Sequence, residues 1–267
     1  MKSPKISVIM PVFNTEKYVW EAIESILNQS FSDFEFIIID DCSTDKSYGV
    51  CDEYAEKDKR IRLYRNEKNK GISFTRNRLI NLSKTNFIAT QDSDDISINN
   101  RLELCFHFLE TNIGFWAVSW NNIIINEIWE KVWVRKYSNN IKNIILKKSP
   151  LSNPSSMFKK DIFLNLWWYD SKLNYWEDYD LWLKMYAQWY FLKNLDEDLI
   201  QYRIRKWQTK DINVKETLRN TIFIQKRAVE DYWMVHTVSD KIYLILEYTL
   251  LYFPNWLVIF LFKKIEY

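Results

Sequence analysis

The sequence predicts an α/β protein with a Rossmann-like, mostly parallel central sheet flanked by helices and followed by a C-terminal helical extension. Short β-branched apolar runs alternate with segments of helical periodicity over the first ninety residues. The 267 residues, 47% of them hydrophobic, are enough to build a sizeable core. In addition, acidic clusters directly follow two of the apolar runs, where strands of such a sheet would end.

The first strand is expected at Ile6–Phe13, a β-branched apolar run bounded by Asn14 and Thr15. Apolar residues then recur every three or four positions over about 16–29, which predicts a helix with one buried face. The same alternation continues along the chain. It predicts strands at 34–39, 61–64 and 87–90, and helices from an N-cap at 43–45 through 54 and at 73–82.

The second half of the chain is less regular. Apolar stretches around 123–125 and 132–134 predict strands or a hairpin that extends the sheet. A helix is expected to open at Glu177. The segment 242–262 is apolar except for Glu247 and is interrupted at Pro254.

Composition excludes several classes of function. Lys plus Arg (37) nearly balances Asp plus Glu (35), so the net charge of +2 gives no reason to expect a nucleic-acid partner. Three cysteines, an odd number, argue against a disulfide framework, and two distant histidines argue against a histidine-based triad. The first apolar run is too short for a signal peptide, so we expect a cytoplasmic protein.

Two acidic clusters are candidates for a binding site. Asp40 and Asp41 follow the second expected strand, and the segment 92–95 (DSDD) follows the fourth. Either cluster alone is equally well explained as turn or capping residues. Together, at equivalent ends of two parallel strands, they favour a ligand site at the carboxyl edge of the sheet.

Six segments, in order, resemble the inverting family 2 glycosyltransferases with a GT-A fold, and the resemblance covers about residues 3–205. They are ISVIMPVFN, NQSFSDFEFIIIDDCSTD, NKGISFTRN, ATQDSDD, NPSSMF and EDYDLWLKM. The resemblance implies transfer of a sugar from a nucleotide-diphosphate sugar to a saccharide or lipid-linked acceptor in cell-surface polysaccharide or glycolipid synthesis. It also implies a catalytic domain over 1–210, followed by a helical region over 211–267.

The resemblance assigns the second acidic cluster to a divalent metal, Mn²⁺ or Mg²⁺. Asp92 and Asp94 match the family's Asp-x-Asp motif, with Asp94 as the direct ligand, Asp95 in support and Ser93 beside the donor. Carboxylate oxygens suit a hard cation, which would neutralise the departing diphosphate.

Other positions match donor-binding residues of the family. Asp41 matches the acid that hydrogen-bonds the nucleotide base, and Pro11, Phe13 and Asn14 match the segment that lines the base. Arg76 matches a basic residue near the diphosphate, where a guanidinium suits phosphate geometry. An ordinary solvated helix charge is the alternative for Arg76.

The resemblance makes Asp178 the general base that takes the acceptor's hydroxyl proton, with Glu177 supporting it. The alternative is that both are carboxylates favoured in the first turn of a helix. Tyr202 and Arg203 match a Tyr-Arg-x-His segment near the diphosphate. Arg205 stands where histidine is usual, which leaves the role of this segment open.

Two other functions are alternatives. A nucleotidyltransferase also uses acidic metal sites, but no glycine-rich phosphate loop follows the first strand, and Asp178 would lack a purpose. A non-catalytic sugar-nucleotide-binding module is disfavoured by the intact acids.

The segment 242–262 is long enough to span a bilayer, but Glu247 and Pro254 favour attachment to the inner face of the plasma membrane; packing on the domain is the alternative.

Glycine is scarce and tryptophan abundant, with 3 Gly and 13 Trp. Family glycine positions fall on 167–168, Trp176 and Trp189, whereas Trp182 matches a true family tryptophan. We hypothesise that most of the other twelve tryptophans are UGA codons that the source reads as glycine, which would bring glycine to about 6%, near its usual share of about 7%.

Overall fold

The computed structural model describes residues 3–166, 168–173, 176–205 and 214–266. Its strands are β1 (Ile6–Val12), β2 (Phe34–Asp40), β3 (Ile61–Arg65), β4 (Phe87–Thr90), β5 (Ile96–Ser97), β6 (Phe115–Ile125), β7 (Lys131–Arg135), β8 (Met157–Lys159) and β9 (Phe191–Arg203). Its helices are α1 (Val19–Leu27), α2 (Ser47–Lys57), α3 (Ile72–Leu82), α4 (Arg101–Thr111), α5 (Ile141–Ile144), η1 (Asn153–Ser155), α6 (Ile162–Asn165), α7 (Glu177–Ala187), α9 (Val214–Glu230), α10 (Val238–Leu250) and α11 (Asn255–Glu266).

One sheet with the strand order β3-β2-β1-β4-β8-β6-β9-β5 runs through the molecule, and β7 pairs with β6 at its side. The four strands β1 to β4 are parallel, as expected from the alternation in the sequence. Beyond them β8 is antiparallel to both β4 and β6, whereas β6 and β9 are parallel. The predicted α/β architecture is confirmed, and the expected hairpin is β6–β7.

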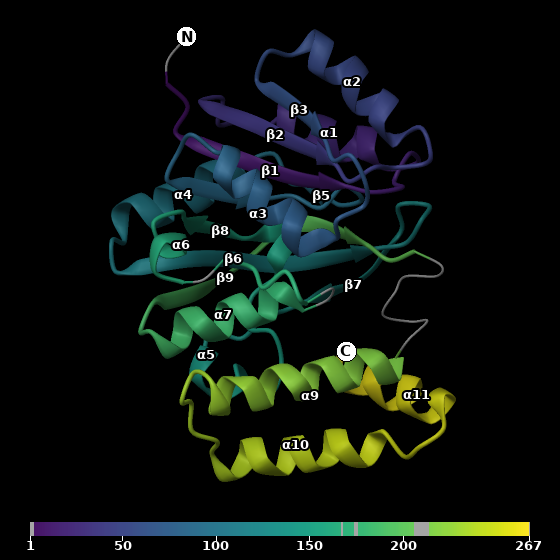
Figure 1. The fold of residues 1–267 in the computed structure, drawn as a ribbon, viewed down its shortest axis with the longest axis vertical. Coiled ribbons are helices and arrows are strands. Elements are labelled where there is room, and N and C mark those ends of the chain that lie inside the picture. Colours follow the sequence, from purple (N-terminus) through teal and green to yellow (C-terminus); the bar gives the residue numbers. More distant parts are fainter. Residues whose placement is uncertain (1–2, 167, 174–175, 206–213, 267) are drawn as a thin grey trace.

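Helices cover both faces of the sheet (Figure 1). Side chains of a strand alternate between its two faces, so β2 contributes to two cores. Phe36 and Ile38 belong to a core with residues of α1, α2 and α4, whereas Ile37 and Ile39 belong to a core with α3, α6 and α7. The apolar runs of the first half are therefore buried on both sides, which explains why they show no polar alternation.

Several elements were not predicted, among them α4, β5 and β9. The strand β9 is the longest, and its middle segment is strongly polar (KNLDED), so it lacks an apolar run that would mark it. It is held instead by pairing with β6 along nearly its whole length. This pairing places the end of β9 beside the acidic cluster that follows β4.

The helices α9, α10 and α11 form a layer below the sheet in Figure 1. Helix α9 packs on α7, and both α10 and α11 pack on α9. The apolar segment 242–262 is divided between two helices, and Pro254 lies in the break between them. Within the described parts of the chain, no helix is long and apolar enough to cross a bilayer.

Candidate active site

A pocket of about 730 Å³ opens where β1, β2 and β4 end, between these strand ends and the start of α7. Most of the residues expected at the site line it. They are Pro11, Phe13, Asp41, Arg76, Asp92, Ser93, Asp94, Glu177, Asp178 and Tyr202. The fold therefore gathers at one edge of the sheet side chains that lie more than a hundred residues apart in the sequence.

Asp41 fixes the loop that leads into α3. Its carboxylate accepts hydrogen bonds from the Lys70 and Gly71 amides, both at 2.9 Å, and from Asn66 Nδ2 at 2.6 Å. Gly71 has a φ of 83°, a conformation that glycine adopts without a steric penalty. Asp41 thereby holds the backbone that forms one wall of the pocket.

Asn14 lies at the end of β1 but is not among the described residues that line the pocket. Its φ of 51° is left-handed, which asparagine tolerates better than most residues. Its side-chain oxygen accepts a hydrogen bond from the Thr44 amide at 2.9 Å, and its own amide donates to Ser43 Oγ at 3.0 Å. The structure thus shows Asn14 joining the loops after β1 and β2, whereas Phe13 beside it is 45% exposed at the pocket.

Arg76 is buried and holds two acids from distant parts of the chain. Its guanidinium pairs with Asp92 at 3.1 Å and with Glu177 at the start of α7. It is therefore not the solvated helix charge considered as the alternative. Burial raises the pKa of the Glu177 carboxyl, and the nearby Asp178 raises it further, while Arg76 opposes both effects.

The acids of the 92–95 segment lie in different surroundings. Asp94 pairs with Arg205 Nη2 at 2.6 Å, and Asp95 accepts a hydrogen bond from the Arg203 amide at 2.9 Å. Burial raises the pKa of Asp94 and holds that of Asp95 well above its usual range, and the neighbouring carboxylates add to both shifts. Asp95 Oδ2 is buried without a hydrogen-bond partner in the described structure.

Tyr202 and Arg203 end β9 next to these acids, but they face different ways. Tyr202 lines the pocket. The Arg203 guanidinium is buried on Glu21 of α1, and its Nε donates to the Asp94 carbonyl at 3.1 Å. Arg203 is not among the described residues that line the pocket. Its contact with the Asp94 carbonyl supports the acidic loop on the side away from the pocket.

Asp178 stands in the first turn of α7, on the wall of the pocket that also carries Glu177. Its Oδ1 accepts a hydrogen bond from the Tyr179 amide at 2.8 Å, which fixes the orientation of the carboxylate. No hydrogen bond from the described part of the chain reaches its Oδ2.

Asp92 and Asp94 are the residues that could hold a metal ion. No group of three or more His, Cys, Asp or Glu side chains forms a ready-made metal site in the described residues. Asp92 pairs with Arg76 through Oδ1, and Asp94 pairs with Arg205 through Oδ2; no arginine of the described residues contacts the second oxygen of either acid. Mg²⁺ and similar ions are commonly bound through one or two carboxylates together with substrate phosphates. The acids therefore fit an ion that a diphosphate would help to hold.

Several lining residues were not identified from the sequence. Asn153 and Pro154 of η1 lie within the NPSSMF segment that contributed to the resemblance, so a signal for them was present. Glu216, Thr217 and Asn220 of α9 also line the pocket. No sequence motif marks these three, because only the packing of α9 on α7 brings them there.

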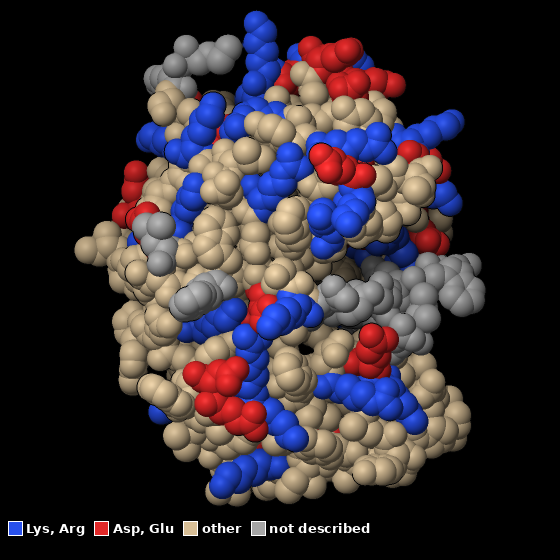
Figure 2. Space-filling view, viewed as in Figure 1, with Lys and Arg blue, Asp and Glu red and all other residues tan. Residues whose placement is uncertain are grey.

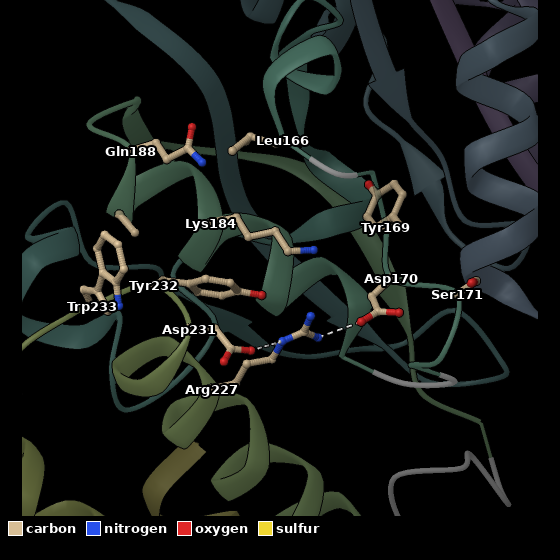
Figure 3. Close-up of a pocket in the computed structure, with 11 residues that line it drawn as sticks. Leu166, Tyr169, Asp170, Ser171, Lys184, Gln188, Arg227, Asp231, Tyr232 and Trp233 are labelled. Atoms are coloured by element: carbon tan, nitrogen blue, oxygen red, sulfur yellow. Dashed lines mark hydrogen bonds and ion pairs between the residues drawn. The ribbon is translucent and has the colours of Figure 1, made fainter.

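A second cavity of about 770 Å³ lies between α7 and the end of α9 (Figure 3). Its charged side chains already neutralise one another: Arg227 pairs with Asp170 at 2.8 Å and with Asp231 at 3.1 Å. Lys184 likewise pairs with Asp180 at 2.7 Å. Asp180 of α7 also pairs with Arg227 of α9 at 3.6 Å and accepts a hydrogen bond from Tyr232 Oη at 2.6 Å, so these two contacts tie the end of α9 to α7. None of the acids predicted for the site lines this cavity.

Comparison with known proteins identifies the family. The model of Glycosyl transferase family 2 matches residues 7–167, which is more than half of the chain. The chain belongs to this family. An uncharacterized glycosyltransferase of Methanocaldococcus jannaschii is 37% identical over 213 residues, covering 76% of this chain and 72% of the relative. The O-antigen biosynthesis glycosyltransferase WbnJ of Escherichia coli is 38% identical, covering 77% and 82%.

Solved structures agree on the GT-A fold of this family 2 chain. TarS of S. aureus superimposes with a TM-score of 0.65 at 20% identity, covering 94% of this chain and 44% of TarS. The mannosyltransferase PcManGT of Pyrobaculum calidifontis, solved with GDP-Man and Mn²⁺, gives a TM-score of 0.64 at 14% identity, covering 96% and 72%. At these identities the likeness concerns the fold alone.

Proposed function

We propose that this family 2 glycosyltransferase is an inverting enzyme that moves a sugar from a nucleotide-diphosphate sugar to a saccharide or lipid-linked acceptor. One observation carries the proposal: a single pocket brings together Asp41, the pair Asp92 and Asp94, and Asp178. The name of the O-antigen relative supports a role in cell-surface polysaccharide synthesis. Related folds solved with UDP-GlcNAc and with GDP-Man support a nucleotide-sugar donor.

The donor would lie along the strand ends. Pro11 and Phe13 would contact the base, and Asp41, already anchored on the loop before α3, would accept a hydrogen bond from it. Arg76 is fixed by two acids, so its positive charge faces the pocket without the freedom of a surface side chain. A guanidinium held in this way can interact with the diphosphate at little further entropic cost.

Asp92 and Asp94 would hold Mn²⁺ or Mg²⁺ together with the diphosphate, with Asp95 behind them. A bound ion would neutralise negative charge on the leaving diphosphate. Arg205 occupies one oxygen of Asp94, so this cation shares the carboxylate with any metal. Burial is the main reason why the pKa of Asp94 is raised, and the like charge of Asp92 adds to it. A cation bound between the two carboxylates would relieve this repulsion.

Asp178 would act as the base. The acceptor oxygen forms a bond to the anomeric carbon while the bond from that carbon to the diphosphate oxygen breaks on the opposite face. The hydroxyl proton passes to the free oxygen of Asp178, and the electron pair leaves with the diphosphate. The hydrogen bond from the Tyr179 amide holds the carboxylate in position for this transfer.

The proposal is tested by incubating the protein with a panel of radiolabelled nucleotide sugars and either Mn²⁺ or Mg²⁺. We expect one donor to release its nucleoside diphosphate, and the anomeric configuration of the transferred sugar to be inverted. A parallel incubation supplies a nucleoside triphosphate and a sugar phosphate in place of the nucleotide sugar. Release of pyrophosphate there would instead indicate a nucleotidyltransferase. Donor binding without any turnover toward water or saccharides would indicate a binding module.

We also infer that α10 rests on the anionic surface of a membrane. It exposes apolar side chains at helical spacing, namely Val238, Ile242, Ile245 and Leu246, and Tyr252 and Phe253 in the turn that follows it are exposed as well. Between 238 and 259 both acids, Asp240 and Glu247, are buried, and Lys241 is the only exposed charge. The bottom edge of the molecule, where α10 lies in Figure 1, accordingly carries few charged side chains in Figure 2. An apolar face next to a lysine suits a lipid surface.

Vesicle sedimentation tests this surface. We expect the protein to sediment with phosphatidylglycerol vesicles and Ile245→Ser/Leu246→Ser to remain in the supernatant. Ile113→Ser is the matched control, because Ile113 is 82% exposed but lies in the turn after α4, far from α10 in the sequence. Concentration-dependent dimers that the double substitution abolishes, without vesicle binding, would contradict membrane contact.

A further inference from the structure

Tryptophans occupy backbone conformations that normally favour glycine. Of the described residues other than glycine, seven have a positive φ. Two are Asn14 and Cys42, and the other five are Trp129 (69°), Trp168 (41°), Trp176 (67°), Trp189 (64°) and Trp233 (56°). A side chain with a Cβ clashes with the backbone in this region, and a bulky residue is a true outlier there. Five such outliers of one residue type in one chain demand a common cause.

The turn after α7 shows what the backbone requires. The Tyr190 amide donates to the Met185 carbonyl at 3.0 Å, and the Trp189 amide donates to the Tyr186 carbonyl at 3.1 Å. This pair of bonds is the Schellman motif, whose left-handed residue is usually glycine. Trp189 occupies that residue.

Burial does not compensate for the unfavourable conformations at two of these positions. Trp189 is 84% exposed and Trp233 is 86% exposed, so neither indole gains appreciably from packing. Trp182 is the opposite case: it lies inside α7, is fully buried and packs against Phe158. Trp120 is also buried, in β6, where its indole N–H donates to Cys105 Sγ at 2.8 Å. A positive φ therefore distinguishes these five tryptophans from Trp120 and Trp182, which suit the elements in which they lie.

We propose that positions 129, 168, 176, 189 and 233 carry glycine in the cell, because the source decodes UGA as glycine, and that Trp182 is a true tryptophan. The scarcity of glycine, 3 residues in 267, is the expected counterpart of such a code. The proposal is independent of the reaction catalysed, since it rests on backbone geometry and composition.

The proposal changes the active-site pocket at position 176. Trp176 lines the pocket directly before Glu177 and Asp178, and its carbonyl accepts a hydrogen bond from the Asp180 amide at 3.0 Å. Glycine would keep this backbone bond and remove the indole from the wall beside the two carboxylates. The space next to Asp178 would then be open to the donor sugar or the acceptor, and no aromatic platform would stand there.

The gene and the native protein decide the matter. We expect UGA codons at these five positions and UGG at Trp182. Peptide mass spectrometry of the protein from its own source should find glycine at the five positions, each peptide being lighter by the difference between an indole side chain and a hydrogen. UGG codons, or tryptophan in those peptides, would overturn the proposal.

Thermal unfolding of the protein made with tryptophan at all these positions tests the backbone argument separately. Trp189→Gly and Trp233→Gly should each raise the melting temperature by about 2–4 °C. Trp20→Gly is the control, because Trp20 is 42% exposed but lies within α1, where glycine is unfavourable and should lower the melting temperature. If all three substitutions lower it equally, the left-handed positions carry no strain and the argument is refuted.

Discussion

Glu247 couples the stability of the C-terminal helices to pH. It lies on α10, is 4% exposed, and burial raises the pKa of its carboxyl to about 8, although Gln225 of α9 opposes the shift with a hydrogen bond. Glu247 Oε2 and Gln225 Oε1 are both buried without a hydrogen-bond partner in the described structure. Because these two buried oxygens receive no hydrogen bond, protonation of the Glu247 carboxyl is favoured, since the protonated carboxyl can donate one.

The direction of the pH effect follows from the raised pKa. The folded state binds the Glu247 proton more tightly than the unfolded state, where the pKa is 4.5. The resulting stabilisation is complete below the unfolded pKa and is lost as the pH rises through about 8. Between about pH 5 and about pH 8 the loss amounts to about 3 kcal/mol. Glu247→Gln has nearly the same shape but no proton to lose, so it should escape this loss.

Urea unfolding followed by circular dichroism measures the difference. The free energy of unfolding of the wild type should fall by about 3 kcal/mol more than that of Glu247→Gln between these two pH values. Taking the difference between the proteins removes the contribution of other titrating groups. Parallel pH dependences would show that Glu247 ionises freely in the folded state and would refute the reasoning.

Three further predictions concern the site and its support. Arg76→Met leaves Glu177 buried without its cation and should cost about 3–5 kcal/mol of unfolding free energy in urea, whereas Arg76→Lys should recover part of it; an unchanged Arg76→Met would contradict the buried pair. Trp182→Ala removes a fully buried indole and should cost about 3–5 kcal/mol by thermal unfolding, in contrast to the exposed tryptophans. Arg205→Gln frees an oxygen of Asp94 and should tighten Mn²⁺ binding about tenfold in calorimetry with a nucleoside diphosphate present; weaker binding would show that Arg205 assists the metal site.

The first half of the fold was predictable because its strands are buried on both faces and its helices have clear apolar faces. The local sequence pattern is therefore sufficient to predict the order of strands and helices as far as β4. The strand β9 was not predictable, because its polar middle segment is stabilised by a partner strand distant in the sequence. Helix α9 enters the pocket only through its packing on α7, which no local pattern records.

Most acids that line the pocket could be named from the sequence, because motif order and strand ends mark them; Glu216 of α9 could not. The residues that pair with these acids could not be named from the sequence. That Arg76 joins Asp92 to Glu177, and that Arg203 turns away to Glu21, depends on how the fold brings distant segments together. The glycine deficit was visible in the composition, and the family pattern already set Trp176 and Trp189 apart from Trp182; the φ values add Trp129 and Trp233.

The central claim is that Asp178 is the base of a glycosyl transfer in this pocket. Once the donor is known, the most direct measurement compares Asp178→Asn with the wild type, using the transfer rate and the donor dissociation constant from calorimetry. The transfer rate should fall by about 10²–10⁴-fold while the donor affinity stays nearly unchanged, because the amide keeps the shape but cannot accept the proton. A mutant that transfers sugar at close to the wild-type rate would contradict the claim.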